Sequence, residues 1–449
     1  MLYSRLICYV SELGFLGMAR GFLKLFLVVF PFQIRTLVFN MSFFPTGNFN
    51  EYASYFIYLS DLLLLGAFIL FALALLRGEK TKQEEIRFGY LPFTIFLMLF
   101  LMTLMGTVFV AEYKMVSFFQ VFRFVELFLL YFLLVNELLE RKEVIRYFLY
   151  GVIIQTFIAL GQYLLQSSVG LRFLGEPILK NTIPGVAKID LDGFQMMRSY
   201  GTFPHPNALA GTMIIALLWA YYLFRRNVWI FTVVGGLCIM ALLFTFSRSA
   251  FLALAGGLLV YFSLFEGKIR LKHVLLWGSV TLFIVVLFNM EGVLLERIFF
   301  GNDPASGLER LNYMTASKQM FLDQPFGVGL GHFTLHLQDY LATRLSPWLF
   351  QPVHNVFFLI ANEAGFIALG LFLALLGTLF YRLLKISRTG KKDERIFRSL
   401  SLTILIMVVI ISVFDHYFFT LYPAQVLLFL YFALVSSDVS NSLLPRRNS

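Results

Sequence analysis

Three arginines and one histidine are the residues whose chemical types and positions could support catalysis. Arg198, Arg248 and Arg310 lie in polar stretches between apolar runs, and His354 directly precedes a long apolar run. A guanidinium offers a fixed fork of donors that suits phosphate oxygens, and such contacts strengthen near a low-dielectric boundary. A neutral imidazole can remove a proton from a hydroxyl. Together these side chains could bind a lipid diphosphate and activate an acceptor.

Each of these residues also has a simpler explanation. Arginines at a membrane interface often bond lipid headgroups, and a histidine can cap a helix. His205, between two prolines, fits the start of a helix with Pro206 at the first helical position. It remains a secondary candidate, as does Asn355 beside His354.

A second pair of histidines has the spacing of metal ligands. His332 and His336 are four residues apart and Asp339 follows, but the pattern has no HExxH glutamate and no clear third ligand. We therefore expect no metal and no other cofactor. The more ordinary interpretation is an amphipathic helix on the membrane surface. The side chains that it would present to lipid are Phe333, Leu337 and Tyr340.

The elements that must position these residues are membrane helices. Hydrophobic residues make up 59% of the 449 residues and charged residues only 14%, whereas soluble domains carry about 25% charged residues. The sequence therefore predicts an all-α integral membrane protein with one polytopic domain, 1–449. The net charge of +10 resides in short loops, which favours a membrane over nucleic acid as the partner. Cys8 and Cys238 have no disulfide or metal spacing, and the first 20 residues do not resemble a signal peptide.

Apolar runs long enough to cross a bilayer recur along the chain, at roughly 20 residues per helix. They predict about twelve spans in a GT-C-like arrangement, of which the first, interrupted by Lys24, Pro31 and Arg35, could instead be an interfacial helix. The spans are 22–39, 55–76, 88–110, 115–135, 144–165, 206–224, 228–246, 250–265, 274–290, 355–380, 400–413 and 418–435.

Two thirds of the 36 Lys and Arg residues fall in alternate loops and at both ends of the chain, so both termini should be cytoplasmic. The stretch 228–265 is too long for one crossing and must reverse at Ser247-Arg248-Ser249, with Ser249 as helix cap. The segment 291–353 then forms a large helical extracytoplasmic loop. Arg198, Arg248 and Arg310 fall on this outer face, against the general charge trend, and this placement favours a site over headgroup contacts.

Between residues 198 and 376 the sequence resembles the O-antigen ligase and O-antigen polymerase superfamily of bacterial lipid-linked glycan transferases. The matching motifs occur in the order that the family shows. They are Arg198 with Gly201-Thr202-Phe203 and Pro206-Asn207, Thr245-Phe246-Ser247-Arg248-Ser249-Ala250, Glu309-Arg310, Pro325-Phe326-Gly327-Val328-Gly329-Leu330-Gly331, and His354-Asn355 with Glu363-Ala364-Gly365.

The resemblance implies an inverting, metal-independent transfer of a glycan from undecaprenyl diphosphate to a hydroxyl of a glycan or lipid A-core acceptor. The reaction would take place at the periplasmic or outer face of the bacterial cytoplasmic membrane. Arg198 and Arg248, assisted by Arg310, would bind the donor diphosphate, and His354 would activate the acceptor. Where the family usually has a tryptophan after the loop arginine, this chain has Tyr313 and Met314.

Two alternatives remain open. One is a polymerase of the same superfamily rather than a ligase. The other is a transporter or flippase of a lipid-linked saccharide, because ionisable residues in or near spans mark functional sites by default. Those residues are Asp61, Glu126, Asp415 and His416.

Overall fold

The computed structural model describes residues 2–40, 50–79, 85–191, 194–264 and 304–443, and it is mostly helical. The long helices are α1 (Leu2–Val29), α2 (Leu59–Leu76), α3 (Leu91–Val110), α4 (Lys114–Val135), α5 (Arg141–Leu165), α6 (Pro206–Phe224), α7 (Val228–Thr245), α8 (Arg248–Leu264), α11 (Pro304–Asp323), α13 (Val356–Ile386), α14 (Lys392–Phe414) and α16 (Tyr422–Asn441). Short helices are η1 (Glu51–Ala53), η2 (Arg172–Leu174), α12 (Phe333–His336), η4 (Leu337–Tyr340), η5 (Pro347–Leu349) and α15 (Tyr417–Thr420).

Within the described residues, nine helices are long and apolar enough to cross a membrane: α2 to α7, α13, α14 and α16. Helix α8, with 17 residues, is shorter. The expected span at 274–290 lies outside the described residues, so the count of twelve spans stays a prediction. The first expected span, 22–39, was placed wrongly: α1 ends at Val29, and Arg35–Asn40 is a strand.

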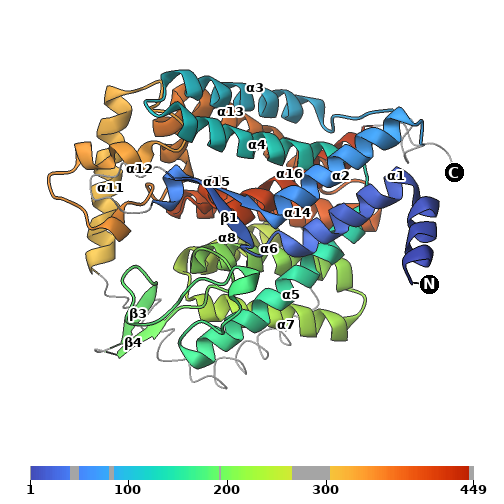
Figure 1. Cartoon of the computed structure of the whole chain (residues 1–449), viewed down its shortest axis with the longest axis horizontal. Helices are drawn as coiled ribbons and strands as arrows, with labels where there is room; N and C mark the ends of the chain where they lie inside the picture. Colours follow the sequence, from blue (N-terminus) through green and yellow to red (C-terminus); the bar gives the residue numbers. More distant parts are fainter. Residues whose placement is uncertain (1, 41–49, 80–84, 192–193, 265–303, 444–449) are drawn as a thin grey trace.

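Two small antiparallel hairpins accompany the helices. Strand β1 (Arg35–Asn40) pairs with β2 (Ser54–Tyr58), which leads directly into α2. Strand β3 (Lys188–Leu191) pairs with β4 (Phe194–Met197) in the segment between α5 and α6. Figure 1 shows β3, β4, α11 and α12 at one end of the molecule and both termini at the other. Both termini therefore lie at the end opposite α11 and α12, and which end faces the cytoplasm stays a prediction from the loop charges.

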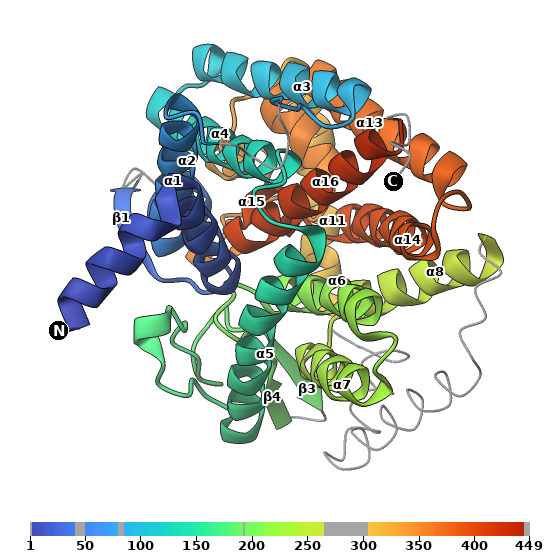
Figure 2. The same cartoon turned by 90° about the vertical axis from the view of Figure 1, so that its right-hand side faces the viewer.

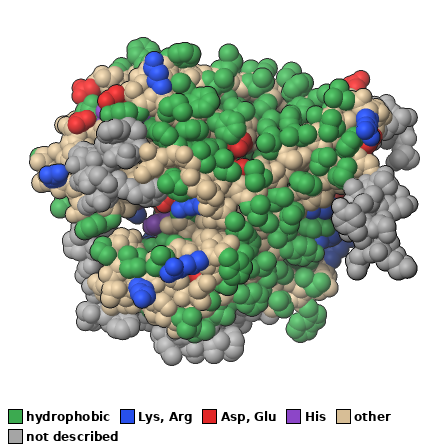
Figure 3. All heavy atoms as spheres, in the orientation of Figure 1, with side chains coloured by type: hydrophobic (Ala, Val, Ile, Leu, Met, Phe, Trp, Pro, Cys, Tyr) green, Lys and Arg blue, Asp and Glu red, His purple; other side chains and the backbone are tan. Residues whose placement is uncertain are grey.

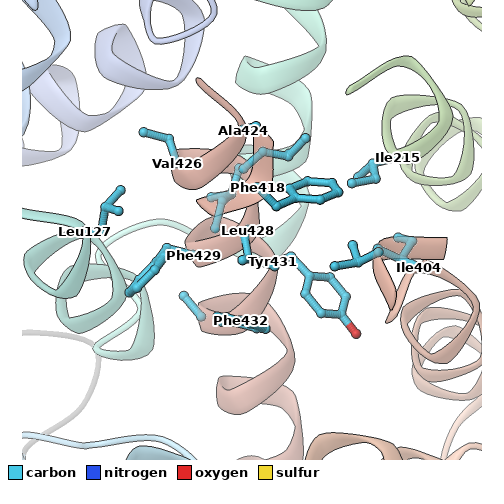
Figure 4. Packing of buried hydrophobic residues seen from close by; sticks show 14 of the residues in the cluster. Leu127, Ile215, Ile404, Phe418, Ala424, Val426, Leu428, Phe429, Tyr431 and Phe432 are labelled. Atoms are coloured by element: carbon cyan, nitrogen blue, oxygen red, sulfur yellow. The ribbon is translucent and has the colours of Figure 1, made fainter. Parts of the chain in front are cut away.

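Helix α16 lies at the centre of the bundle. Figure 2, seen from the end with the termini, shows α4, α6, α13 and α14 around it. In Figure 4 its side chains interleave with Leu127 of α4, Ile215 of α6 and Ile404 of α14. Buried residues make up 89% of its span, against 33% for α2 and α3. Asp438 near its end bonds Arg141 at 2.5 Å and Arg398 at 2.6 Å.

Candidate active site

His354 lies immediately before α13 and is enclosed by rings from distant parts of the sequence. The ring of Tyr313, from α11, stacks on it with centroids 6.3 Å apart and planes 5° apart. The ring of His416, between α14 and α15, meets it at 5.2 Å and 74°. Nδ1 of His354 is buried and has no hydrogen-bond partner among the described residues. The ring is therefore held by aromatic contacts, and its Nδ1 atom is not engaged by the described residues.

Asn355, expected as a secondary candidate, fixes the position of its neighbour. Its side-chain oxygen accepts the N–H of Phe358 at 3.0 Å and so caps α13. Its amide nitrogen donates to the carbonyl of Val413 at 3.1 Å, which ties the start of α13 to the end of α14. The oxygen and the nitrogen of the Asn355 side chain are thus both hydrogen-bonded. These bonds fix the position of the neighbouring His354.

Asp415 is the buried carboxylate of the site. It follows α14, is 4% exposed, and accepts the backbone N–H of His416 at 2.9 Å and the side-chain amide of Asn207 at 2.7 Å. The charges of His416, His354 and His205 lower its pKa, so these three rings face the same carboxylate. Burial alone would raise the pKa of Asp415, but the histidines and the bond from Asn207 outweigh it.

Burial controls the protonation of the three histidines. It lowers the pKa of His354 to about 3, and the charges of His416, Arg310 and His205 add to this effect against Asp415. The pKa of His205 also falls to about 3, chiefly through burial and then Arg198, and that of His416 to about 4. The imidazole of His354 is therefore neutral at pH 7 and can accept a proton.

Arg198 reaches this cluster through Asn207. The residue is only 6% exposed, with Nε donating to the carbonyl of Thr245 at 2.6 Å and Nη2 to the Asn207 side chain at 2.5 Å. Asn207 then donates to Asp415. The chain of bonds Arg198, Asn207, Asp415 joins the segment before α6 to the end of α14 and fixes the carboxylate.

The turn that carries these residues into α6 is held by buried glutamines of α5. The side-chain oxygen of Gln162 accepts the N–H groups of Tyr200 and Gly201, each at 2.9 Å. That of Gln155 accepts the N–H of Thr202 at 2.8 Å. The backbone N–H groups of a buried turn need hydrogen-bond acceptors, and the glutamine side chains provide these acceptors inside the bundle. His205 then begins α6, with Nδ1 accepting the N–H of Asn207 at 3.1 Å, as its flanking prolines predict.

Arg248 and Arg310 are more exposed than Arg198. The chain reverses at Phe246, whose φ is 48°, and α8 begins at Arg248 itself, one residue before the expected cap Ser249. Arg248 is exposed at the start of α8. Arg310 is exposed on α11, and its charge lowers the pKa of all three histidines. In Figure 3 a hollow in this face has histidine and basic side chains at its edge.

The glycine-rich segment packs against α13. The N–H of Val328 donates to the carbonyl of Asn362 at 2.8 Å, and that of Gly329 to the carbonyl of Glu363 at 3.0 Å. The N–H of Phe366 donates back to the carbonyl of Pro325 at 3.1 Å. The segment meets α13 where the helix is interrupted at Gly365, with φ 81°. It thereby links the end of α11 to the helix that follows His354.

The amphipathic surface helix expected at 332–340 is not present. Phe333 and Leu337 are both fully buried, because this segment packs under α11 and against α4 rather than on lipid. His332 is also buried, and its Nε2 accepts the N–H of Tyr113 at 3.0 Å. In the described ranges, no three His, Cys, Asp or Glu residues come together as a metal site.

Sequence reasoning did not connect Asp415, His416 or Tyr313 with His354. The first two counted toward a transporter, whereas the fold places them in the same cluster as His354. The available signal was an acidic residue directly followed by histidine at the outer end of an expected span. Tyr313 lies in the region where the family that the sequence resembles usually has a tryptophan. Its hydroxyl donates to the carbonyl of Leu349 at 2.6 Å.

Residues 236–373 match the family model described as O-antigen ligase. Among curated proteins, none matches the chain. The family match covers Arg248, Arg310, the glycine-rich segment and His354, and it confirms the resemblance over that part of the sequence. Arg198, His205, Asp415 and His416 lie outside it and join the site through the fold.

Proposed function

Because residues 236–373 match the family model described as O-antigen ligase, we propose that this protein is a membrane glycosyltransferase that moves a glycan from undecaprenyl diphosphate to an acceptor hydroxyl. The reaction takes place at the outer side of the bacterial cytoplasmic membrane. The observation that carries the proposal is the enclosed, neutral imidazole of His354 beside Asp415, with the charges of Arg198 and Arg310 acting on the same histidine cluster.

The proposed reaction is a direct displacement at the sugar carbon. The acceptor O–H gives its proton to His354 while its oxygen bonds to the anomeric carbon. The bond from that carbon to the diphosphate oxygen breaks, and undecaprenyl diphosphate leaves with the electron pair. Inversion at the carbon follows from a single displacement, and no metal takes part in this scheme.

Arginine charge would stabilise the departing diphosphate, the kind of electrostatic effect that is often the largest in catalysis. Arg248 and Arg310 are exposed and suit direct contact with the donor. Arg198 is tied to Thr245 and Asn207, so its contribution to the donor site is through charge at short range and through the position of Asp415. We keep all three as donor-site residues.

The low pKa of His354 is a property of the protein without substrate. A bound diphosphate adds negative charge near the ring and favours the imidazolium form, so the pKa of His354 rises when the donor binds. The donor would thereby convert a weak base into one better matched to the reaction.

The transporter alternative has less support. Asp61 and Glu126, its strongest case in the sequence, both bond Arg123 at 2.6 Å. A carboxylate that is already paired with a fixed arginine is not available to carry a proton or cation through the bundle. Ligase and polymerase remain two forms of the same proposal, which differ only in the acceptor.

The test is turnover by the purified protein in lipid nanodiscs. Given a lipid-diphosphate glycan and candidate acceptors, the wild type should release undecaprenyl diphosphate and form the extended acceptor. His354→Ala should bind donor but release none. If donor instead crosses sealed vesicles without being consumed, the transporter alternative is correct.

A further inference from the structure

Tyr313 is a buried aromatic residue that takes no part in the proposed displacement. It is only 2% exposed, and its ring lies parallel to that of His354, with planes 5° and centroids 6.3 Å apart. This separation falls within the range of about 4.5–7 Å over which aromatic pairs interact. The contact joins α11 to the segment that carries the proposed base.

His354 depends on neighbouring rings for its orientation. Its Nδ1 has no hydrogen-bond partner among the described residues, whereas a catalytic base is commonly oriented by a hydrogen bond to a third group. The ring of His416 meets the imidazole at 5.2 Å and 74°, and the ring of Tyr313 lies parallel to it. A parallel and a steeply inclined neighbour together restrict rotation of the imidazole.

The ring of Tyr313 is itself fixed at its far end. Its hydroxyl donates to the carbonyl of Leu349 at 2.6 Å, in the short helix η5. The N–H of Leu349 donates to the carbonyl of Ser346 at 2.9 Å, so the acceptor belongs to a turn that is closed by its own backbone bond. The side chain of Tyr313 therefore cannot swing away from His354 without breaking the bond to Leu349.

Helix α11 is held against α13 one turn beyond Tyr313. The side-chain amide of Asn362, on α13, donates to Oγ of Ser317 at 2.6 Å, and both residues are fully buried. Tyr313, Ser317 and Met320 recur at helical spacing and are all buried, so they share one face of α11. This face both packs on α13 and presents Tyr313 to the residue that precedes α13.

We propose that Tyr313 is a positioning residue for His354: its ring fixes the plane of the imidazole, and its bond to Leu349 fixes the ring. That His354 acts as the base rests on the proposed function, whereas the fixing of its ring by Tyr313 does not. Arg310 lies one turn before Tyr313 on α11. The helix that carries an arginine of the proposed donor site thus also orients the base.

Glycan transfer by the full-length protein in nanodiscs tests this role, with variants that separate the ring from the hydroxyl. Tyr313→Leu removes the ring and should lower kcat by about 10- to 100-fold, the size of effect that a misplaced catalytic group produces. Tyr313→Phe keeps the ring, loses one hydrogen bond and should stay within about fivefold of the wild type. The KM for donor should change little in either variant, because Arg248 and Arg310 remain in place.

Met320→Ala is the matched control. Met320 is also fully buried on this face of α11, so its truncation should lower the melting temperature while kcat stays close to that of the wild type. Wild-type kcat in Tyr313→Leu, or an equal loss of kcat in Met320→Ala, overturns the proposal. Tyr313→Met, which also lacks a ring, replaces Tyr313→Leu if that variant does not fold.

The pH profile distinguishes positioning from loss of packing. Burial is the main cause that lowers the pKa of His354. Removal of the covering ring admits water and raises this pKa toward its ordinary value, so the acid limb of kcat/KM should move to higher pH in Tyr313→Leu but not in Met320→Ala. The groups whose charges act on His354 are unchanged in these variants: His416, Asp415, Arg310 and His205.

A last measurement needs no turnover. Diethyl pyrocarbonate modifies neutral imidazoles, and mass spectrometry of the peptide that contains His354 follows the rate. We expect faster modification of His354 in Tyr313→Leu than in the wild type, Tyr313→Phe or Met320→Ala. An unchanged rate in Tyr313→Leu overturns the proposal. Faster modification in a protein that transfers no glycan would support the contact while the proposed function fails.

Discussion

Gly327 and Gly365 contact each other's segments backbone to backbone. A Cβ atom on Gly327 would lie 2.6 Å from the carbonyl oxygen of Glu363, and one on Gly365 would lie 2.6 Å from that of Phe326. Both glycines have positive φ, 93° and 81°. The backbone of the glycine-rich segment therefore packs directly against the interruption of α13. Neither segment has room for a side chain at this contact.

Gly365→Ala should destabilise the protein and lower glycan transfer. Gly365 has φ 81° and ψ 175°, a conformation that is essentially restricted to glycine and costs a residue with a Cβ about 1–3 kcal/mol, and the contact with Phe326 must also open. Thermal unfolding in detergent measures the first effect and release of undecaprenyl diphosphate the second. Gly370→Ala, on the same helix with nothing within 4 Å of its Cβ, is the control and should be neutral or slightly stabilising. Equal melting temperatures for both variants would contradict this close backbone contact at Gly365.

The pH dependence of transfer should show the base rising in pKa when donor binds. His354 acts in its neutral form, so the rate falls only when the pH drops below its pKa. In the free protein that pKa is about 3, so kcat/KM for donor should stay level from pH 8 down to about pH 4 unless another group titrates. The acid limb of kcat should lie at higher pH, because the bound anion stabilises the imidazolium. Superimposable acid limbs would count against this account.

His354→Ala should reduce transfer by about 10²- to 10⁴-fold, the usual contribution of a general base. Donor affinity should change little, because the proposed donor contacts come from the arginines. The measurement is single-turnover transfer beside equilibrium donor binding. A variant that transfers glycan at the wild-type rate would remove His354 from the mechanism.

Arg198→Ala should lower stability, whereas Arg248→Ala should weaken donor binding. Arg198 is buried and satisfies Thr245 and Asn207, so its loss leaves buried acceptors unpaired and costs about 1–3 kcal/mol of stability. Arg248 is exposed, so its loss should weaken donor binding without changing the melting temperature. Arg344→Ala, another exposed arginine of the long polar segment, should change neither. Loss of stability in Arg248→Ala would contradict its assignment to the donor.

The ion-pair cluster of Arg123, Asp61 and Glu126 should be structural. Arg123→Leu leaves the buried carboxylate of Asp61 and the partly buried one of Glu126 without their cation and should cost about 3–5 kcal/mol. The triple variant Asp61→Asn, Arg123→Leu, Glu126→Gln should recover most of that loss, because no uncompensated charge remains. Melting temperatures of the single and triple variants give the comparison. A stable triple variant that has lost only substrate movement across vesicles would instead favour a transporter.

The sequence predicts most helices closely because a bilayer imposes a simple requirement of length and apolarity. The expected span 206–224 coincides with α6, and 228–246 differs from α7 by one residue. The first span failed because residues 36–39 are apolar enough to extend a helix but belong to a strand that pairs with β2 instead. Strand pairing depends on a distant segment, which hydropathy does not detect.

The site was partly predictable for a similar reason. His354, Arg198 and Arg310 have recognisable residue types and neighbours, and the structure brings them near one another. The role of Asp415 depends on α14 ending beside the start of α13, through the bond between Asn355 and Val413. The burial of Phe333 and Leu337 likewise depends on tertiary packing, because an amphipathic pattern does not distinguish lipid from a neighbouring helix.

The central position of α16 has a consequence for biogenesis. It is the least apolar of the nine candidate spans and also the most buried, with Asp438 at one end. During synthesis it emerges after every helix that surrounds it, so it must enter an assembly whose other members are already in the membrane. Until then Arg141 and Arg398 have no carboxylate of Asp438 to bond. Arrival of α16 is therefore the step at which the surrounding helices gain their common packing partner and both arginines gain their carboxylate.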